Sequence, residues 1–412
     1  MLRPGPRATV MLLAVALAAA LGGCGKTALR RHPPAGPAAA VTPVAPQGAV
    51  SVVTKNTTRL GGADAASDAA AVARAVYPGL TPATRPQVVV VVDERNWPAA
   101  LAAAVMASAP IGAPLLYSEG TTLPEVSLQA LEAMRPSGSA ALGGAQVILL
   151  GSSAPAPAGY VSRTVAVPSA SAAAAAASVE RLFTASLSAG PRQVIMVASD
   201  TPRAIQMPAA GLAAESGSPI LFAASTGVPR ATGAVLSRLR RPSIYLVGFS
   251  SIAKGTLGEL GHFGPVIPIA QTGTPAQAPT PVGNSIAVAR FTDGVFGWGV
   301  KEPGHGLVFA NAGQPLDAPA AAPLSASGQY GPLLLLERPD AVPTPLASYL
   351  ADIQPAYGKA PQYQPVHGAY NHGWLIGNES AISPATQAEI DAMLEIVPAK
   401  AASEESSSVS PE

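Results

Sequence analysis

Three segments of this chain repeat one order of features: an apolar run, a proline, a stretch of small residues, a second proline and another apolar run. They lie at residues 88–117, 194–222 and 307–336. The two prolines are 16 residues apart in the first segment (Pro98 to Pro114) and 17 apart in the other two. One match could be chance, but three in the same order indicate a triplication. A repeat of this length constrains the fold more than any local feature does.

The apolar runs are short, and stretches that favour helix separate them. In the first segment, residues 88–92 are all valine, and residues 115–117 form a second apolar run. Runs of this kind are typical of strands that are buried on both faces. The alanine-rich residues 99–108 follow Pro98, which suits the first turn of a helix. Short buried strands that alternate with helices predict an α/β fold with parallel sheets flanked by helices.

Each repeat continues to a third apolar run that ends at a glycine, which predicts a third strand. These strands are expected at residues 147–150, 244–247 and 375–376. A long helix is expected before the second segment at residues 172–187, with Ser169 as its N-cap. The first helix of the third repeat is expected at residues 285–296.

Charged side chains are scarce, at 12% of the chain, and the formal net charge is +1. Residues 1–23 contain Arg3 and Arg7 and no acid, so the remainder has 23 basic and 24 acidic side chains, a net charge of −1. Proteins that bind nucleic acid show a clear excess of basic side chains. The composition therefore predicts no nucleic-acid partner.

The first 24 residues are typical of an export signal. Arg3 and Arg7 precede an uncharged run at 8–21, which is too short to span a bilayer and has the length of a secretory signal core. The run leads to Leu-Gly-Gly-Cys, and Cys24 is the only cysteine of the chain. This stretch resembles a bacterial lipoprotein signal, which implies a mature N-terminus that carries palmitate or a similar acyl chain. We expect an exported protein, lipid-anchored in the cell membrane and facing the cell wall. The alternative is an ordinary secretory peptide with an incidental cysteine.

The composition along the chain divides it into segments. Proline and alanine dominate after Cys24, which suits an extended tether. The expected organisation is a signal peptide at 1–23, the lipidated Cys24 and tether at 24–50, repeat one at 51–167, repeat two at 168–270, a linker at 271–281, repeat three at 282–397 and a disordered tail at 398–412.

The opening of repeat one carries a family resemblance. Residues 59–64 read Arg-Leu-Gly-Gly-Ala-Asp, and Asn-Trp-Pro-Ala-Ala at 96–100 and Gly-Ala-Pro-Leu-Leu at 112–116 follow the first helix and the valine run. This order resembles the type 2 cell wall-binding repeat family over residues 51–397, with Ala65 where the family has a second arginine. The resemblance implies three tandem Rossmann-like modules, packed as a compact pseudo-threefold unit. It also implies non-covalent attachment to anionic cell-wall polymers.

Motifs for catalysis are missing from the sequence. It has no Gly-x-Ser-x-Gly elbow, no phosphate-binding loop and no Gly-x-Gly-x-x-Gly. His367 and His372 lie five residues apart, but too few Cys or acidic neighbours surround them for a metal site. Nearby tyrosines at 357, 363 and 370 suit either stacking on sugars or packing against the body. The repeats fill almost all of the exported chain, so we expect no enzyme, no cofactor and no metal.

Polar residues follow the first strand of each repeat, where parallel α/β sheets place their ligand sites. The candidate ligand-binding residues are Asp93, Asn96 and Trp97 in repeat one, Asp200 and Arg203 in repeat two, Asn311, Gln314 and Asp317 in repeat three, and Arg59 and Asp64 from the opening motif. They would face a polymer or sugar. The alternative is that the same residue types cap helices and form turns.

We therefore predict a non-catalytic cell-envelope lipoprotein whose three repeats bind a cell-wall polymer or glycan. Two other functions remain open. A solute-binding lipoprotein would capture a small ligand between α/β modules, and a cell-wall hydrolase accessory is the weaker alternative. The low charge weighs against a tight grip on a polyanion.

Overall fold

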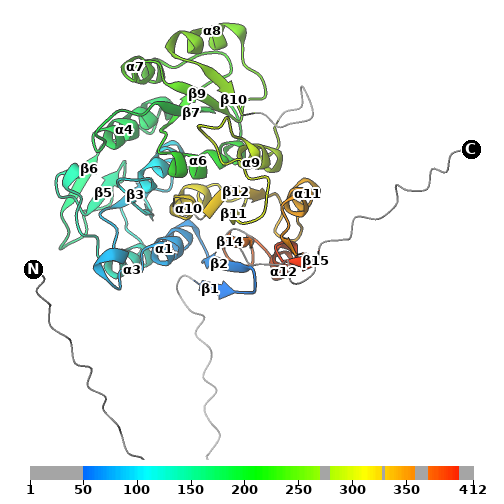
Figure 1. Ribbon diagram of the computed structural model, residues 1–412. Coiled ribbons are helices and arrows are strands. Elements are labelled where there is room, and N and C mark those ends of the chain that lie inside the picture. The colour runs from blue at the N-terminus through cyan, green and yellow to red at the C-terminus, as the bar shows by residue number, and fades with distance from the viewer. Residues whose placement is uncertain (1–49, 270–278, 327–329, 358–369, 399–412) are drawn as a thin grey trace, which may run out of the picture. The chain divides into compact units, whose positions relative to one another are not determined.

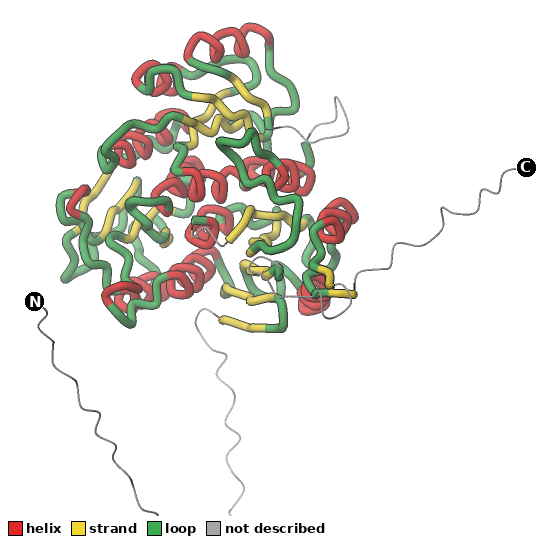
Figure 2. The backbone as a smooth tube through the Cα atoms, in the orientation of Figure 1, coloured by secondary structure: helices red, strands yellow, loops and turns green. Residues whose placement is uncertain are grey.

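The computed structural model describes residues 50–269, 279–326, 330–357 and 370–398 (Figure 1). Three main sheets with helices beside them account for most of these residues (Figure 2). The predicted signal peptide, Cys24, Tyr363, His367 and the tail beyond residue 398 lie outside the described ranges. Within those ranges, no helix has the length and apolarity needed to cross a membrane.

The first sheet belongs to repeat one, and all of its strands are parallel. In pairing order they are β4 (Leu115–Ser118), β3 (Val89–Asp93), β5 (Val147–Leu150) and β6 (Ser162–Val165). The connections contain η1 (Pro82–Thr84), α2 (Trp97–Ala103), η2 (Ala104–Ala107), α3 (Glu125–Met134) and η3 (Ala140–Leu142). Successive valines of β3 point to opposite faces: Val90 packs in one core with Leu101 of α2, and Val91 in another with Leu131 of α3. Helices on both faces thus explain the uninterrupted valine run.

The second sheet has the same order and is also fully parallel. Its strands are β8 (Ile220–Ala223), β7 (Gln193–Ala198), β9 (Ser243–Val247) and β10 (Val266–Pro268). Its helices are α4 (Ala172–Thr184), α5 (Arg203–Gln206), α6 (Pro208–Ser216), α7 (Arg230–Arg238) and α8 (Lys254–Phe263).

The third sheet has five strands. They are β12 (Tyr330–Leu336), β11 (Gly306–Asn311), β14 (His372–Ile376), β2 (Thr57–Gly61) and β1 (Val50–Val53), of which only β1 is antiparallel to its neighbour. The accompanying helices are α9 (Pro281–Arg290), α10 (Asp317–Ser325), α11 (Thr344–Asp352) and α12 (Pro384–Met393), and β13 (Ala356–Tyr357) pairs with β15 (Val397–Pro398).

The strand that opens repeat one in the sequence lies in the sheet of repeat three. β2 pairs in parallel with β14, with Arg59 opposite Leu375 (Figure 1). The fourth strands of the other two sheets, β6 and β10, come from the end of their own repeats and lead into α4 and α9. In the same way, β2 leads into α1 (Ala65–Val76). The N-terminal strand therefore supplies the position that the C-terminal repeat lacks.

The helix that follows the first strand is equivalent in each repeat, and these helices pack against one another. α2, α6 and α10 contact each other pairwise, and all three are rich in alanine. A Cβ on Gly211 of α6 would lie only 2.9 Å from the Ser325 Oγ of α10. Small side chains let these helices approach closely, which explains why so much of the core is alanine.

The structure confirms the predicted α/β fold of three Rossmann-like modules with parallel sheets flanked by helices. One predicted helix cap, one predicted helix start and two predicted helix ends are wrong: α4 ends at Thr184 and not at residue 187. Ser171, not Ser169, caps α4, because its side chain accepts from the Ala174 N–H. α9 begins at Pro281 after the cap Thr280 and ends at Arg290, since the next residue is already extended. His372, one of the two histidines considered for a metal site, lies in β14.

Candidate functional site

A cavity of about 280 Å³ lies where segments of the three repeats meet. We call it the junction cavity; it is lined by residues 63–65, Arg203 and residues 314–317. Four of the ten residues that the sequence singled out, Asp64, Arg203, Gln314 and Asp317, are therefore brought together. They come from the opening of repeat one and from the turns after β7 and β11, at the carboxyl ends of parallel strands, where ligand sites of α/β folds occur.

Helix caps and a hydrogen-bonded turn hold the walls of the junction cavity in place. Asp64 is the N-cap of α1, and its carboxylate accepts from the Ser67 N–H at 2.8 Å. The Gln314 N–H donates to the Asn311 carbonyl at 2.9 Å, and this turn leads into α10. Asp317 begins that helix, so its carboxyl group lies near the positive end of the helix dipole.

A pair of buried carboxyl groups lies behind the junction cavity. Asp68 of α1 and Asp317 of α10 are each 1% exposed, and the Asp68 Oδ1 accepts from the Gly62 N–H at 2.7 Å. The Asp317 Oδ2 has no hydrogen-bond partner among the described residues. Burial raises the pKa of Asp68 to about 6, and burial and the facing Asp68 raise the pKa of Asp317 well above its usual range. At least one of the two carboxyl groups is thus protonated near neutral pH.

Contacts between repeats adjoin the junction cavity, whose lining includes Leu316 and Arg203. The Tyr117 hydroxyl of β4 donates to the Leu316 carbonyl at 2.6 Å. The Trp97 Nε1 of α2 donates to the Gln206 Oε1 of α5 at 2.7 Å, and the Arg203 guanidinium lies 6.0 Å from the centre of the Trp97 ring. Trp97 was predicted to face a ligand; it is 3% exposed and joins repeats one and two.

Arg59, another predicted ligand residue, is buried and hydrogen-bonded to the C-terminal repeat. Its Nε donates to the Gln387 side chain at 3.0 Å, and its Nη2 donates to the Ile382 carbonyl at 2.7 Å. Its Nη1 donates to the carbonyls of Gly377 and Asn378 at 3.1 and 2.8 Å. With these acceptors, the guanidinium holds β2 in the third sheet.

Three further candidates form turns or caps. Asp93 pairs with the Arg95 guanidinium at 2.6 Å, and this hydrogen bond holds the pKa of the carboxyl below its usual range. Asn96 caps α2 by accepting from the Ala99 N–H. Asn311 accepts from the Gly313 N–H and donates to the Ala381 carbonyl. This is the alternative role that the sequence left open for these residue types.

Asp200 lies in a second, smaller cavity of about 250 Å³ at the carboxyl end of the second sheet. Its carboxylate accepts from the backbone and hydroxyl of Ser225 at 2.9 and 2.5 Å. We call it the serine cavity; its lining is Ala198, Asp200, Thr201, Ser225, Phe249, Ser250 and Ser251. Hydroxyl groups that both donate and accept suit the hydroxyls of a sugar.

Sequence reasoning missed several residues of these cavities. Asp68 is an acid four positions after Asp64 in an alanine-rich helix, and a lone acid on a buried face was a usable signal. Ser250 and Ser251 lie shortly after β9, the third strand of repeat two, at the same carboxyl end of the sheet as the predicted Asp200. Among the described residues, no cluster of three His, Cys, Asp or Glu side chains could hold a metal ion.

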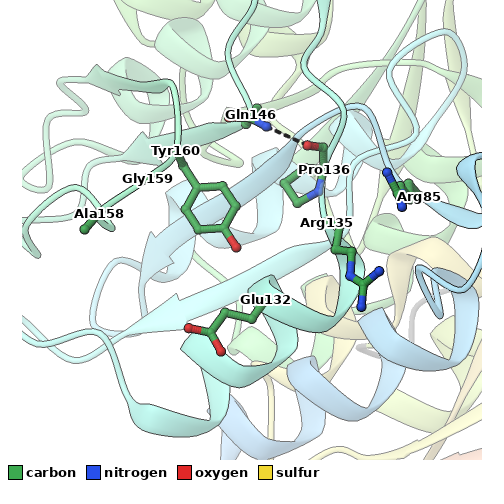
Figure 3. A pocket seen from close by; sticks show the side chains of 8 residues that line it. All are labelled: Arg85, Glu132, Arg135, Pro136, Gln146, Ala158, Gly159 and Tyr160. Carbon is green, nitrogen blue, oxygen red and sulfur yellow. Dashed lines mark hydrogen bonds between the residues drawn. The ribbon is translucent and has the colours of Figure 1, made fainter.

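A third and larger cavity lies in repeat one, at the amino end of the first sheet (Figure 3). It measures about 440 Å³, and its lining includes Arg85, Arg135 and Tyr160. None of these residues was predicted to bind a ligand. Ligand sites at the amino ends of parallel strands are unusual in this class of fold, so no ligand site was expected there from the sequence.

No family model and no curated protein matches this sequence. The solved structures that share its fold include two proteins from one organism. Cwp6 from Clostridium difficile matches 84% of this chain and 51% of its own, with a TM-score of 0.62 and 16% identity. Cwp8 from the same organism matches 83% of this chain and 53% of its own, with a TM-score of 0.60 and 16% identity. This chain thus spans about half the length of these structures, and at this identity the likeness shows the fold alone.

Proposed function

We propose that this protein is a non-catalytic component of the cell envelope whose three repeats attach to a cell-wall polymer or glycan. The observation that carries the proposal is the shared fold. Cwp6 and Cwp8 are cell wall proteins of C. difficile, and their fold extends over more than four fifths of this chain. The lipoprotein-like signal that ends at Cys24 adds export and a membrane anchor, so the chain would connect membrane and wall.

The polar side chains that line the cavities support this proposal. The serine cavity offers hydroxyl groups and the Asp200 carboxylate, which can share hydrogen bonds with sugar hydroxyls. The three cavities differ in the residues that line them and in charge, so each would contact a different chemical group of a long polymer. Several weak contacts on one chain add up to firm attachment without a single deep site.

Co-sedimentation with purified cell wall tests the proposal. The full chain would be used with Cys24→Ser, which prevents acylation, on wall before and after removal of its covalently attached anionic polymers. We expect binding to native wall and loss of most binding after removal. Equal recovery in the supernatant with both walls would overturn the proposal. Gels that contain wall material should show no clearing, and clearing would indicate a hydrolase instead.

The junction cavity favours one second candidate, capture of a small ligand between the repeats. The buried Asp317 Oδ2 has no hydrogen-bond partner among the described residues, so the carboxyl group could form a hydrogen bond with a polar group of a ligand. Thermal-shift screening with small amines, amino acids and sugars tests this function. A specific stabilisation that Asp317→Asn removes, together with no wall binding, would favour the solute-binding function over wall attachment.

A further inference from the structure

The cavity in repeat one, which we call the arginine cavity, lies at the opposite end of the sheet from the predicted ligand residues. Arg85 precedes β3, and Gln146 directly precedes β5. Arg135 and Pro136 follow α3, and Tyr160 lies shortly before β6 (Figure 3). Asp93 and Asn96 lie at the other, carboxyl end of β3. A ligand here would therefore use none of the residues described above.

Two arginines of this cavity are free to bind an anion. Neither the Arg85 nor the Arg135 guanidinium has a hydrogen bond or an ion pair within the described part of the chain, whereas Arg95 and Arg238 each pair with an acid. The Arg85 Nε is also buried without an acceptor. A buried donor without an acceptor is unfavourable, and a planar guanidinium matches the oxygens of a carboxylate or phosphate.

The walls of the arginine cavity are held in place without a ligand. Gln146 links its two sides: the Nε2 donates to the Pro136 carbonyl at 2.8 Å, and the Oε1 accepts from the Val161 N–H at 3.0 Å. The Ser137 N–H donates to the Pro86 carbonyl at 3.0 Å. Arg135 has φ 51° and ψ 62°, a left-handed position at the end of a helix that glycine usually occupies. Replacing Arg135 by glycine would therefore remove the charge without straining the backbone.

The opposite wall suits the rest of a sugar. Figure 3 shows the Tyr160 ring extending towards Glu132 of α3, with Arg135 and Arg85 further along the cavity. The ring offers a flat face to a pyranose, and Glu132 has a carboxylate that can accept from sugar hydroxyls. A volume of about 440 Å³ lies within the usual range for small-ligand sites.

We propose that the arginine cavity binds an acidic sugar unit, with its phosphate or carboxylate at Arg85 and Arg135 and its ring on Tyr160. This inference rests on the proposed attachment to a cell-wall glycan, because it names the unit that the first repeat would recognise. The site uses one acidic group per unit, which is compatible with the low overall charge of the chain.

The test is titration calorimetry of the full chain, carrying Cys24→Ser, with glucose 6-phosphate, glucuronate, glucose and inorganic phosphate. We expect one of the two acidic sugars to bind, which separates a phosphate from a carboxylate ligand, and glucose to bind at least about tenfold more weakly. Inorganic phosphate should bind more weakly than the phosphorylated sugar. Equal binding of glucose and both acidic sugars, or no binding of either acid, would overturn the proposal.

Variants locate the site. Arg135→Gly removes the charge at a position where glycine is unstrained, and Arg85→Gln keeps a polar side chain; each should weaken binding of the acidic sugar by about tenfold. Arg163→Gln, at an exposed arginine of β6, is the matched control and should bind as the parent does. Unchanged binding in both cavity variants would overturn the site. Wall co-sedimentation of the parent protein separates the two proposals. Wall binding by the parent, together with unchanged binding of the acidic sugar in both cavity variants, removes only the inference, whereas no wall binding by the parent removes the proposed function.

Discussion

The Arg59 Nη2 lies 2.7 Å from the carbonyl oxygen of Ile382, a residue 323 positions later in the chain. This contact joins β2, near the start of the repeat region, to the last repeat. Because β2 fills the fourth position of the third sheet, between β14 and β1, the two ends of the repeat region stabilise each other. A small number of residues join β2 to the third repeat, and Arg59 makes more of the side-chain hydrogen bonds between them than any other residue.

Arg59→Met should destabilise the protein by about 3 kcal/mol or more, since it leaves buried carbonyl groups without donors. Gly377 and Ile382 would each lose the guanidinium as a partner. The measurement is urea unfolding of the full chain. Arg163→Met, at an exposed arginine, is the control and should change the unfolding free energy by less than about 0.5 kcal/mol. Equal effects of the two variants would contradict the closing role of Arg59.

The buried pair Asp68 and Asp317 predicts an unusual dependence of stability on pH. In the folded state the pKa of Asp68 is about 6, against its usual 3.8, so between these values the folded protein holds a proton that the unfolded chain releases. This contribution to stability is complete below pH 3.8 and is lost as the pH rises through 6. From Asp68 alone, the unfolding free energy should fall by about 3 kcal/mol over this range.

The Asp317→Asn variant isolates the contribution of the carboxyl pair to the pH dependence of stability. The side chain introduced at position 317 would carry an amide N–H that can donate to the Asp68 carboxylate without taking up a proton from solvent. The Asp317→Asn variant should therefore be more stable than the parent at pH 7.5 and similar to it at pH 4.5. Asp340→Asn, at an exposed carboxylate, is the matched control. Urea unfolding at the two pH values is the measurement. The same pH dependence in the parent and in Asp317→Asn would show that the pair does not titrate in this way.

The contact between Gly211 and Ser325 predicts a sharp limit on side-chain size where α6 meets α10. Gly211→Leu should destabilise by about 2 kcal/mol, because added atoms must force two packed helices apart. Gly211→Ala should be close to neutral, since a gain in helix propensity offsets a small shift of the Ser325 hydroxyl. Gly258→Leu in α8, where a new Cβ would meet nothing within 4 Å, is the control. Thermal unfolding of the three variants decides the matter.

The positions of the helices and strands could be predicted from the sequence better than the pairing of the strands. The valine run became β3 because a strand buried on both faces needs only a local apolar pattern. The pairing of β2 with β14 depends on contacts across more than 300 residues, which no local pattern carries. The same reason explains why Arg59 was interpreted as a ligand residue.

The candidate site was predicted in part. Positions after the first strands led to Arg203, Gln314 and Asp317, and the opening motif led to Asp64. The structure places all four around the junction cavity. Asp93 and Asn96 have the same residue types at the same kind of position, yet they form a turn and a cap. Sequence cannot separate these outcomes, because caps and ligand sites use the same polar groups.

The proposed anchor at Cys24 predicts a simple difference between two forms of the protein. The parent should incorporate labelled palmitate and fractionate with membranes, whereas Cys24→Ser should incorporate none. A Thr42→Ser variant, in the same tether, should behave as the parent does. Label that persists in Cys24→Ser would contradict lipidation at this residue.

Attachment to the wall is tested most directly by locating the Cys24→Ser protein in cells. This variant has no lipid anchor, so a membrane anchor cannot account for any protein that stays with the cell envelope. If the three repeats bind a wall polymer, most of this protein should remain with the wall fraction after washing. It should leave the wall when the anionic polymers are extracted. If instead the protein appears in the culture medium, the repeats do not hold the wall, and attachment to a cell-wall polymer is contradicted.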